Sequence, residues 1–251
     1  MGKISVVGIG PGSTDDMTYR AHRTIEEATA VVGYSRYIQL IADLVEGKKV
    51  LDTGMTQEID RCRAALEEAA AGENVVVISS GDAGIYGMAG LVLELLMKMD
   101  EDQRPEFGGV IPGVSAMSAA AGLLGAPIMH DFAVISLSDL LTPWELIQER
   151  AELAAKGDFV TVLYNPRSHK RVGQIQAVQE IFLRERTPET PVGIVTSASR
   201  EGENVLISTL GAFTKEDINM FSIVIIGNSK TKQNGQWMIT PRGYQKREPG
   251  L

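Results

Sequence analysis

The sequence of 251 residues has a single cysteine, Cys62, so it cannot form an internal disulfide. Secreted domains of modest size are often stabilised by disulfides, and one isolated thiol instead favours a reducing compartment. We therefore expect a cytoplasmic protein. Cys62 lies on the apolar face of a predicted helix, where a cysteine is more often a core residue than a nucleophile.

Metal-binding patterns, positive charge and long apolar runs are also lacking. No cluster of histidine, cysteine and acidic residues has the spacing of a zinc site, so we expect no metal ion. The formal net charge is −8, and no long stripe of lysine and arginine offsets it, which argues against a nucleic-acid partner. No run of 18 apolar residues occurs, so we expect no membrane-spanning helix.

Two common nucleotide-binding motifs are absent from the glycine-rich segment near the N-terminus. The dinucleotide fingerprint G-x-G-x-x-G would need a glycine at position 13, where the chain has Ser13. The phosphate-binding loop would need a lysine after its last glycine, and none stands there. The segment Gly8-Ile9-Gly10-Pro11-Gly12 ends a β-branched run, as loops that bind ligands in α/β proteins do. A different ligand is therefore expected.

Strand and helix patterns alternate along the first half of the chain, which predicts a mostly parallel sheet with crossover helices. In the second half neighbouring strand patterns have short connections, which predicts a mixed sheet with antiparallel pairs. We therefore expect an α/β fold of two domains, residues 1–128 and 129–251. The tail after Asn228 is polar and is expected to be partly mobile.

Four loops rich in glycine or serine each follow a predicted strand. Glycine at a strand end permits a positive φ and lets a ligand approach the backbone. One such loop is most often an ordinary turn, but four in succession across two domains favour a shared cleft. The loops cover residues 8–12, 79–86, 112–116 and 164–171.

Two side chains in these loops have both a functional and a structural interpretation. Asp82 stands at a strand end, where its carboxylate either reaches a ligand or caps a helix predicted over residues 84–97. Ser115 has the same two interpretations, because a predicted helix begins at Ala116. No serine or cysteine of the sequence belongs to a recognisable nucleophile motif, and G-x-S-x-G is absent.

A cationic cluster follows the predicted strand over residues 159–164. Its members are either an anion-binding surface or the solvated start of a helix predicted over residues 168–184. The cluster consists of Arg167, His169, Lys170 and Arg171.

The ordered set of loops resembles the tetrapyrrole methylase family, the class III S-adenosylmethionine (SAM) methyltransferases. The resemblance spans nearly the whole chain, with G-x-G-P-G first, then S-G-D, then P-G-V-S-A, then the second domain. Residues 33–37, 80–90 and 164–168 are most similar to the subgroup that methylates C-17 of precorrin-3B in cobalamin biosynthesis. Relatives that act on uroporphyrinogen usually carry Gly-Asp-Pro where this chain has Gly81-Asp82-Ala83, which also favours the C-17 subgroup.

The resemblance implies a homodimer whose subunits each hold an active site in the cleft between two α/β domains. It implies SAM as cofactor and a precorrin-type tetrapyrrole as substrate, with Gly10 and Gly12 where the two meet. Residues expected to contact SAM come from both domains. They are Pro11, Ser80, Gly81, Asp82, Ile85, Ser115, Ala116, Asn165 and Ala198.

The substrate carries several carboxylates, so an anionic protein needs a local positive surface to bind it. We expect Arg36, Arg167 and Arg171 to contribute to that surface, with His169, Lys170, Arg20 and Arg23 nearby. In the C-17 subgroup methylation is coupled to contraction of the macrocycle, which requires acid–base assistance. Asp82 and His169 are the candidates for that role.

Three alternatives remain. In the first alternative, the chain is another methylase of the same fold that acts at a different ring position or on a different substrate. In the second, it is a nucleotide-dependent oxidoreductase, but the absence of the dinucleotide fingerprint argues against this. In the third, it is a non-catalytic SAM-binding regulator. Whether the substrate carries cobalt or is metal-free also remains open.

Overall fold

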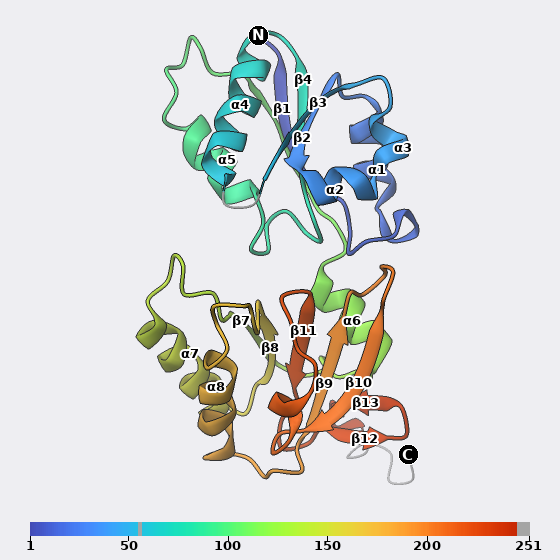
Figure 1. Cartoon of the computed structure of the whole chain (residues 1–251), viewed down its shortest axis with the longest axis vertical. Coiled ribbons are helices and arrows are strands. Elements are labelled where there is room, and N and C mark those ends of the chain that lie inside the picture. The colour runs from blue at the N-terminus through green and yellow to red at the C-terminus, as the bar shows by residue number, and fades with distance from the viewer. Residues whose placement is uncertain (55–56, 245–251) are drawn as a thin grey trace. The chain divides into compact units, whose positions relative to one another are not determined.

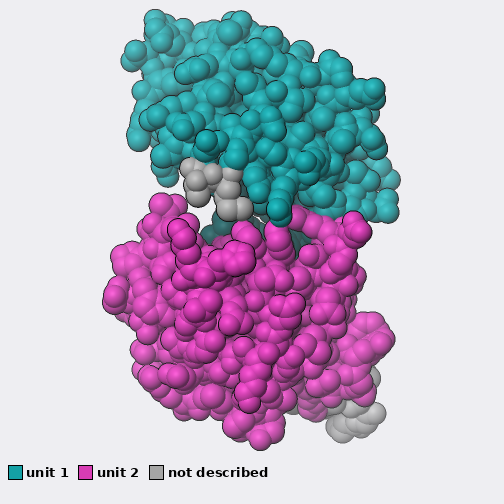
Figure 2. Space-filling model, in the orientation of Figure 1, with its two compact units in different colours: residues 1–116 teal, residues 117–251 magenta. Residues whose placement is uncertain are grey.

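The computed structural model describes residues 1–54 and 57–244. These residues form an α/β protein with two compact units, which Figure 1 shows as a ribbon and Figure 2 in separate colours. The first unit is Met1–Ala116 and the second is Met117–Leu251. The division falls at the start of helix α6 (Ala116–Leu124), whereas the sequence pattern predicts a domain boundary after residue 128. That boundary stays a prediction.

A parallel sheet forms the centre of the first unit, with strand order β3-β2-β4-β1-β5. Every neighbouring pair is parallel, so the carboxyl ends of all the strands lie at one edge. We call the segments that follow the strands there, residues 9–13, 35–36, 54, 80–88 and 112–116, the first carboxyl edge. The strands are β1 (Lys3–Gly8), β2 (Ala30–Tyr34), β3 (Lys49–Thr53), β4 (Asn74–Ser79) and β5 (Glu106–Ile111).

Helices cover both faces of this sheet (Figure 1). On one face Ile25 of α1 packs with Val7 and Ile78, and on the other Cys62 of α4 packs with Val6 and Val77. Successive strand residues face opposite sides, so the apolar runs of β1 and β4 supply both cores. The first face carries η1 (Thr14–Asp16), α1 (Tyr19–Glu26), α2 (Ser35–Leu40) and α3 (Ala42–Val45), and the second α4 (Glu58–Ala70) and α5 (Ala89–Leu96).

A mixed sheet forms the centre of the second unit, with strand order β10-β9-β11-β8-β7. β7 and β8 are parallel and the other neighbours are antiparallel, as the sequence predicts for this half. β7, β8 and β9 therefore run in one direction, and residues 137–143, 165–173, 197–203 and 219–221 gather at their ends as the second carboxyl edge. The strands are β7 (Phe132–Ser136), β8 (Val160–Tyr164), β9 (Pro191–Thr196), β10 (Asn204–Thr209) and β11 (Ser222–Ile226).

Helices α7 (Trp144–Lys156) and α8 (Gln174–Leu183) pack on one face of this sheet, where η2 (Phe213–Lys215) adds the buried Phe213. Helix α6 (Ala116–Leu124) packs on the other face. A Cβ atom on Gly193 of β9 would lie 2.4 Å from a methyl carbon of Leu124, so this position admits little more than glycine.

The segment after Asn228 was expected to be partly mobile, but the structure gives it regular pairing. β12 (Lys232–Asn234) pairs with β13 (Trp237–Ile239), which in turn pairs in parallel with β6 (Gly125–Ala126). These pairings give backbone groups of a polar segment hydrogen-bond partners, and the mobility of the segment stays a prediction. Residues 245–251 lie outside the described part of the chain.

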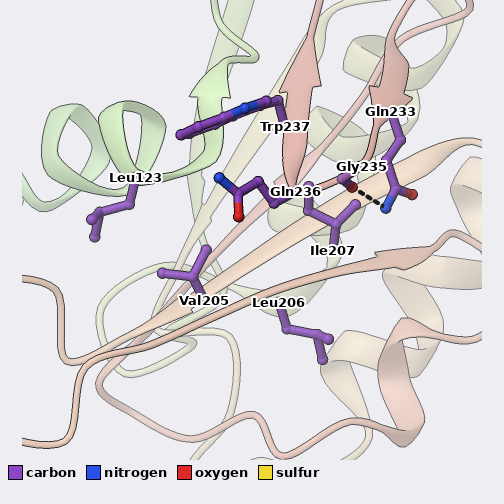
Figure 3. Close-up of a pocket in the computed structure, with 8 residues that line it drawn as sticks. All are labelled: Leu123, Val205, Leu206, Ile207, Gln233, Gly235, Gln236 and Trp237. Carbon is purple, nitrogen blue, oxygen red and sulfur yellow. Dashed lines mark hydrogen bonds between the residues drawn. The ribbon is translucent and has the colours of Figure 1, made fainter.

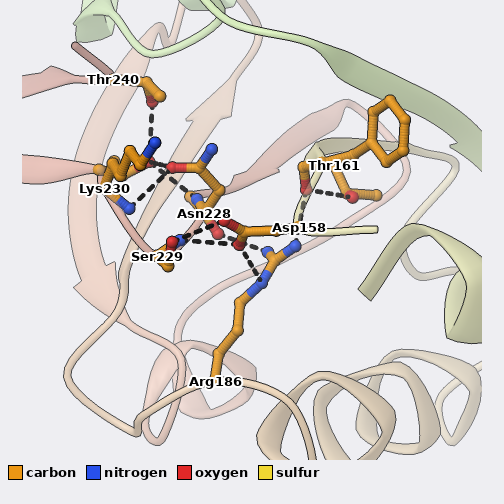
Figure 4. Close-up of polar contacts among 10 residues, drawn as sticks. Asp158, Thr161, Arg186, Asn228, Ser229, Lys230 and Thr240 are labelled. Carbon is orange, nitrogen blue, oxygen red and sulfur yellow. Dashed lines mark hydrogen bonds and ion pairs between the residues drawn. The ribbon is translucent and has the colours of Figure 1, made fainter. Parts of the chain in front are cut away.

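A buried arginine holds the opposite end of the second sheet (Figure 4). Arg186 donates hydrogen bonds to the carbonyl oxygens of Gly227 and Phe159, and its Nε lies 3.7 Å from Oδ1 of Asp158. Asp158 in turn accepts hydrogen bonds from the backbone and hydroxyl of Ser229, at 2.9 and 2.6 Å. Burial lowers the pKa of Arg186 to about 10. The cluster joins the start of β8 to the segment after β11.

Candidate functional site

The first sheet reverses its direction of winding between β1 and β4, which are neighbours. The chain leaves β1 through α1 on one face and leaves β4 through α5 on the other (Figure 1). In open α/β sheets ligands bind outside the carboxyl ends of strands at such a switch point. The loops that begin at Ile9 and Ser80 stand there, which makes the first carboxyl edge a candidate site.

Three of its loops meet backbone against backbone. A Cβ atom on Gly113 would lie 2.2 Å from the carbonyl oxygen of Gly81 and 2.7 Å from that of Gly8. A Cβ atom on Gly8 would lie 2.6 Å from the same oxygen of Gly81. Real Cβ atoms do not approach this closely, so these two positions require glycine for packing. The sequence marks these glycines but gives no sign of their mutual contact.

Gly10 and Gly81 form a short bridge across the switch point. Gly10 N–H donates to the oxygen of Gly81 at 3.1 Å, and Gly81 N–H donates to the oxygen of Gly10 at 2.7 Å. Both residues have positive φ, +82° and +67°, which glycine adopts without a steric penalty. Pro11 and Gly12 follow directly, and Pro11 is buried.

Asp82 links two of the loops through its carboxylate. Oδ1 accepts the N–H of Gly84 at 2.8 Å, and Oδ2 accepts the N–H of Gly113 at 3.0 Å. The expected helix over residues 84–97 begins at Ala89, and Met88 is its N-cap. The capping interpretation of Asp82 is therefore wrong, because the residues between Asp82 and α5 form a loop rather than a helical turn.

The other predicted residues of the first unit also lie at this edge. Ser115 is buried directly before α6, and Ala116 is the first residue of that helix. Ser80 is half-buried after β4, while the side chain of Ile85 is exposed. Tyr86, next to it, is exposed and has a φ of 52°, a left-handed conformation that is costly for a bulky residue.

Three predicted cationic residues of the first unit are exposed: Arg36 in α2, and Arg20 and Arg23 in α1. A fourth arginine was not predicted. Arg61 is buried and donates to Oγ1 of Thr53 at 2.7 Å and to the oxygen of Gly54 at 2.8 Å, next to Sδ of Met88. Its position in an apolar helix face gives no signal in the sequence.

Asn165 and Arg171 organise the second carboxyl edge. Asn165 has a φ of 51° and donates through Nδ2 to Oγ of Ser136 at 3.0 Å. Arg171 donates through Nη1 to the oxygens of Leu137 and Asn165, at 2.9 and 3.0 Å, and its Nε lies 3.8 Å from Asp139. The guanidinium of Arg171 is therefore bound to its own unit.

The cationic cluster is not the start of a helix. The helix expected from residue 168 begins at Gln174, so the interpretation as a solvated helix start is wrong. His169 and Lys170 are exposed in the loop after β8, and Arg167 is half-buried.

The loop after β9 contains Ala198, which is buried between two residues in the left-handed region, Ser197 (φ 54°) and Ser199 (φ 59°). Ser197 N–H donates to the oxygen of Phe221 at 3.1 Å, which ties this loop to the start of β11. The structure thus brings Asn165 and Ala198 to the same edge of the second sheet.

A pocket of about 330 Å³ lies elsewhere in the second unit (Figure 3). Its lining residues include no acid, base or thiol, and none of the predicted site residues. They are Leu123, Val205, Leu206, Ile207, Gln233, Gly235, Gln236 and Trp237.

Within residues 1–54 and 57–244, no group of three or more histidine, cysteine or acidic side chains is placed to hold a metal ion. Over the same residues, no helix has the length and apolar character needed to cross a membrane.

Comparison with known proteins gives consistent results. Residues 3–214 match the family described as Tetrapyrrole (Corrin/Porphyrin) Methylases. The chain is 50% identical over 241 residues to the probable cobalt-factor III C(17)-methyltransferase of Salmonella typhimurium, covering 96% of this chain and 99% of that protein. It is 49% identical to the cobalt-factor III methyltransferase of Priestia megaterium, over 98% of this chain but only 46% of that longer protein. The crystal structure of the methyltransferase CobJ superposes with a TM-score of 0.90 at 38% identity, covering 96% of this chain and 100% of that one.

Proposed function

The chain belongs to the tetrapyrrole (corrin/porphyrin) methylases, and from this premise we propose that it transfers a methyl group from SAM to C-17 of a cobalt-containing tetrapyrrole in cobalamin biosynthesis. The observation that carries the proposal is the similarity to the Salmonella protein, which extends over nearly the full length of both chains. The names of the relatives that are about 50% identical favour a substrate that carries cobalt.

The first carboxyl edge fits SAM as the cofactor. It offers the serine hydroxyls of Ser80 and Ser115, backbone amides and carbonyls, and the Asp82 carboxylate, whose two oxygens keep further lone pairs beyond their backbone hydrogen bonds. Ile85 adds an exposed apolar side chain. The proposed cofactor contacts are Pro11, Ser80, Gly81, Asp82, Ile85, Ser115 and Ala116, with Asn165 and Ala198 from the second unit.

When bound, SAM supplies a methyl group already activated by its sulfonium, so the protein needs no nucleophile of its own. The residues of this chain bind and orient the two reactants and exclude water. The closely packed glycine loops suit that role, because a rigid backbone holds a ligand in one position. Asp82, with both oxygens on backbone N–H groups, holds two of those loops together.

The proposed substrate contacts are Gly10, Gly12, Arg36 and Arg167, with Arg20, Arg23 and Lys170 as further positive charges. Arg171 was expected among them, but its guanidinium hydrogen-bonds to protein carbonyls, which favours a different role for it. For the acid–base step of ring contraction we propose His169, whose side chain is exposed, and Asp82. A His169→Gln variant should keep methyl transfer but slow ring contraction.

We also propose a homodimer that acts in the cytoplasm, as the resemblance and the single cysteine suggest. Light scattering at micromolar concentration tests the assembly. A mass that corresponds to one chain of 27.1 kDa would contradict it.

The direct test incubates the protein with SAM and either cobalt-factor III or the metal-free precorrin-3B. We expect methylation of the cobalt compound, with NMR placing the new methyl group at C-17. If the enzyme prefers the metal-free compound, precorrin-3B takes the place of cobalt-factor III as the proposed substrate. Methylation at another carbon would favour the alternative of a different ring position. Cofactor binding without any methyl transfer would favour a regulator.

A further inference from the structure

Two consecutive leucines project into water from the loop 137–143 at the second carboxyl edge. Leu140 is 77% exposed and Leu141 is 99% exposed. Apolar side chains that stay in water give up the free energy that burial supplies, and single exposed ones are common on any protein. An adjacent pair at the end of a strand, where ligands bind in α/β folds, is more specific.

The two leucines stand on a loop that is held at both of its ends. On one side Arg171 binds the oxygen of Leu137 and pairs with Asp139, whose Oδ2 accepts the side-chain N–H of Gln174 at 3.1 Å. On the other side α7 begins at Trp144, which packs against the core of the second unit. The exposed pair is therefore presented in a fixed place rather than on a free segment.

The same edge combines further apolar surface with positive charge. Val172, in the loop after β8, is 52% exposed, and Phe221, at the start of β11, is exposed too. The exposed His169 and Lys170 stand in the same loop as Val172. Apolar side chains that share an edge with the positive charges of Lys170 and Arg167 suit a ligand with a large apolar face and carboxylates at its rim. A tetrapyrrole has that chemistry.

We propose that Leu140 and Leu141 contact the face of the tetrapyrrole ring and that Arg171 is a positioning residue that holds their loop. The inference rests on the proposed function and names the surface that recognises its substrate. It assigns Arg171 a role through the leucines instead of through a substrate carboxylate, because its Nη1 already donates to two carbonyl oxygens.

The test compares a Leu140→Gln/Leu141→Gln double variant with a Leu153→Gln control. Leu153 is 61% exposed on α7 and lies outside the loop, so it matches the chemistry of the change without the proposed contact. We expect the double variant to raise KM for cobalt-factor III at least fivefold. KM for SAM and the thermal unfolding midpoint should stay at the wild-type values. The control should leave all three unchanged.

Arg171→Gln separates the two roles of the arginine. If Arg171 acts through the leucines, the Arg171→Gln change raises KM for the tetrapyrrole in the wild-type background but raises it little further in the double variant. The salt dependence of KM is then unchanged. An additive effect with a flatter salt dependence would show direct binding of a carboxylate and overturn this role.

The two levels of the proposal fail differently. If the wild-type protein methylates no tetrapyrrole, the proposed function fails and the inference with it. If the wild-type enzyme is active and the double variant has the wild-type KM, only the inference is overturned. Both leucines are exposed, so the double variant is expected to fold.

Discussion

The loops at the two carboxyl edges of this protein are held together by different groups, the backbone at the first edge and side chains at the second. At the first edge the backbones of Gly8, Gly81 and Gly113 touch one another, and a single carboxylate, Asp82, joins two loops. At the second edge side chains do the joining, with Arg171 and Asn165 as the links between loops. Leucine, valine and cationic side chains project from it.

The difference suggests a division of labour in the proposed reaction. A backbone site presents fixed hydrogen-bonding groups at close range, which suits a small polar cofactor. A side-chain site presents apolar area and mobile charges, which suits a large ring with carboxylates. The two edges should therefore respond differently to substitution.

The largest effect is expected from Gly113→Ala at the first edge. The added Cβ would overlap two backbone segments that cannot move aside cheaply, so we expect the free energy of unfolding to fall by about 4 kcal/mol. Gly90→Ala in α5 is the control, since a Cβ atom added there would have no atom within 4 Å. Urea denaturation measures both. A Gly113→Ala protein as stable as the control would contradict the close-packed edge.

Arg186→Met tests whether the stability of the second unit depends on the buried guanidinium of Arg186. The change leaves the oxygen of Gly227 without the donor that Arg186 supplies, and the oxygen of Phe159 keeps only the hydroxyl of Thr161 at 3.1 Å. It also leaves Asp158 without its buried partner, and we expect a loss of about 3 kcal/mol in the free energy of unfolding. The control is Arg184→Met, whose exposed ion pair with Glu152 should contribute less than about 1 kcal/mol. Equal losses in the two variants would show that burial of Arg186 matters little.

Asp82→Asn should weaken cofactor binding more than it lowers stability. Asparagine has one acceptor oxygen, so either Gly84 or Gly113 loses its hydrogen bond, and an NH₂ group faces the remaining N–H. We expect S-adenosylhomocysteine to bind with a free energy weaker by about 1.5 kcal/mol, roughly tenfold in Kd, as calorimetry would show. Asp82→Ala should be at least as weak. Wild-type affinity in both variants would remove Asp82 from the site.

The pH dependence of stability should also separate the units. Burial raises the pKa of Cys62 to about 11 from 9.0, so the unfolded chain ionises first and stability falls as pH rises from 9 to 11. Arg186, with its pKa lowered to about 10, acts in the opposite direction above that pH. Between pH 8 and 10 the wild-type protein should lose about 1 kcal/mol more than Cys62→Ala. Parallel curves would contradict the assignment.

The fold class can be predicted well from the sequence because periodicity reports burial directly. Continuous apolar strands such as 75–78 indicate a parallel sheet covered on both faces, and the short connections after residue 191 indicate antiparallel pairs. The loops that gather at the first carboxyl edge could be recognised because glycine at a strand end marks a place where another backbone or a ligand comes close.

The details of the site could not be predicted for a definite reason. Two helices begin later than expected, at Ala89 and Gln174. The side chains of Asp82 and Ser168 accept the backbone N–H of Gly84 and Arg171, as a helix N-cap does, but both pairs stand in loops. The partner of Arg171 in the loop after β7 is 34 residues away in sequence, and no local pattern reveals a contact of that kind. The buried Arg61 is hidden for a related reason, since its helix face reads as apolar.

The division between the edges is tested most directly by one calorimetric comparison. S-adenosylhomocysteine is titrated into the wild-type protein, the Asp82→Asn variant and the Leu140→Gln/Leu141→Gln variant under identical conditions. We predict about tenfold weaker binding to the Asp82 variant and wild-type binding to the leucine variant. Loss of cofactor binding in the leucine variant, with wild-type binding in the Asp82 variant, would contradict the division.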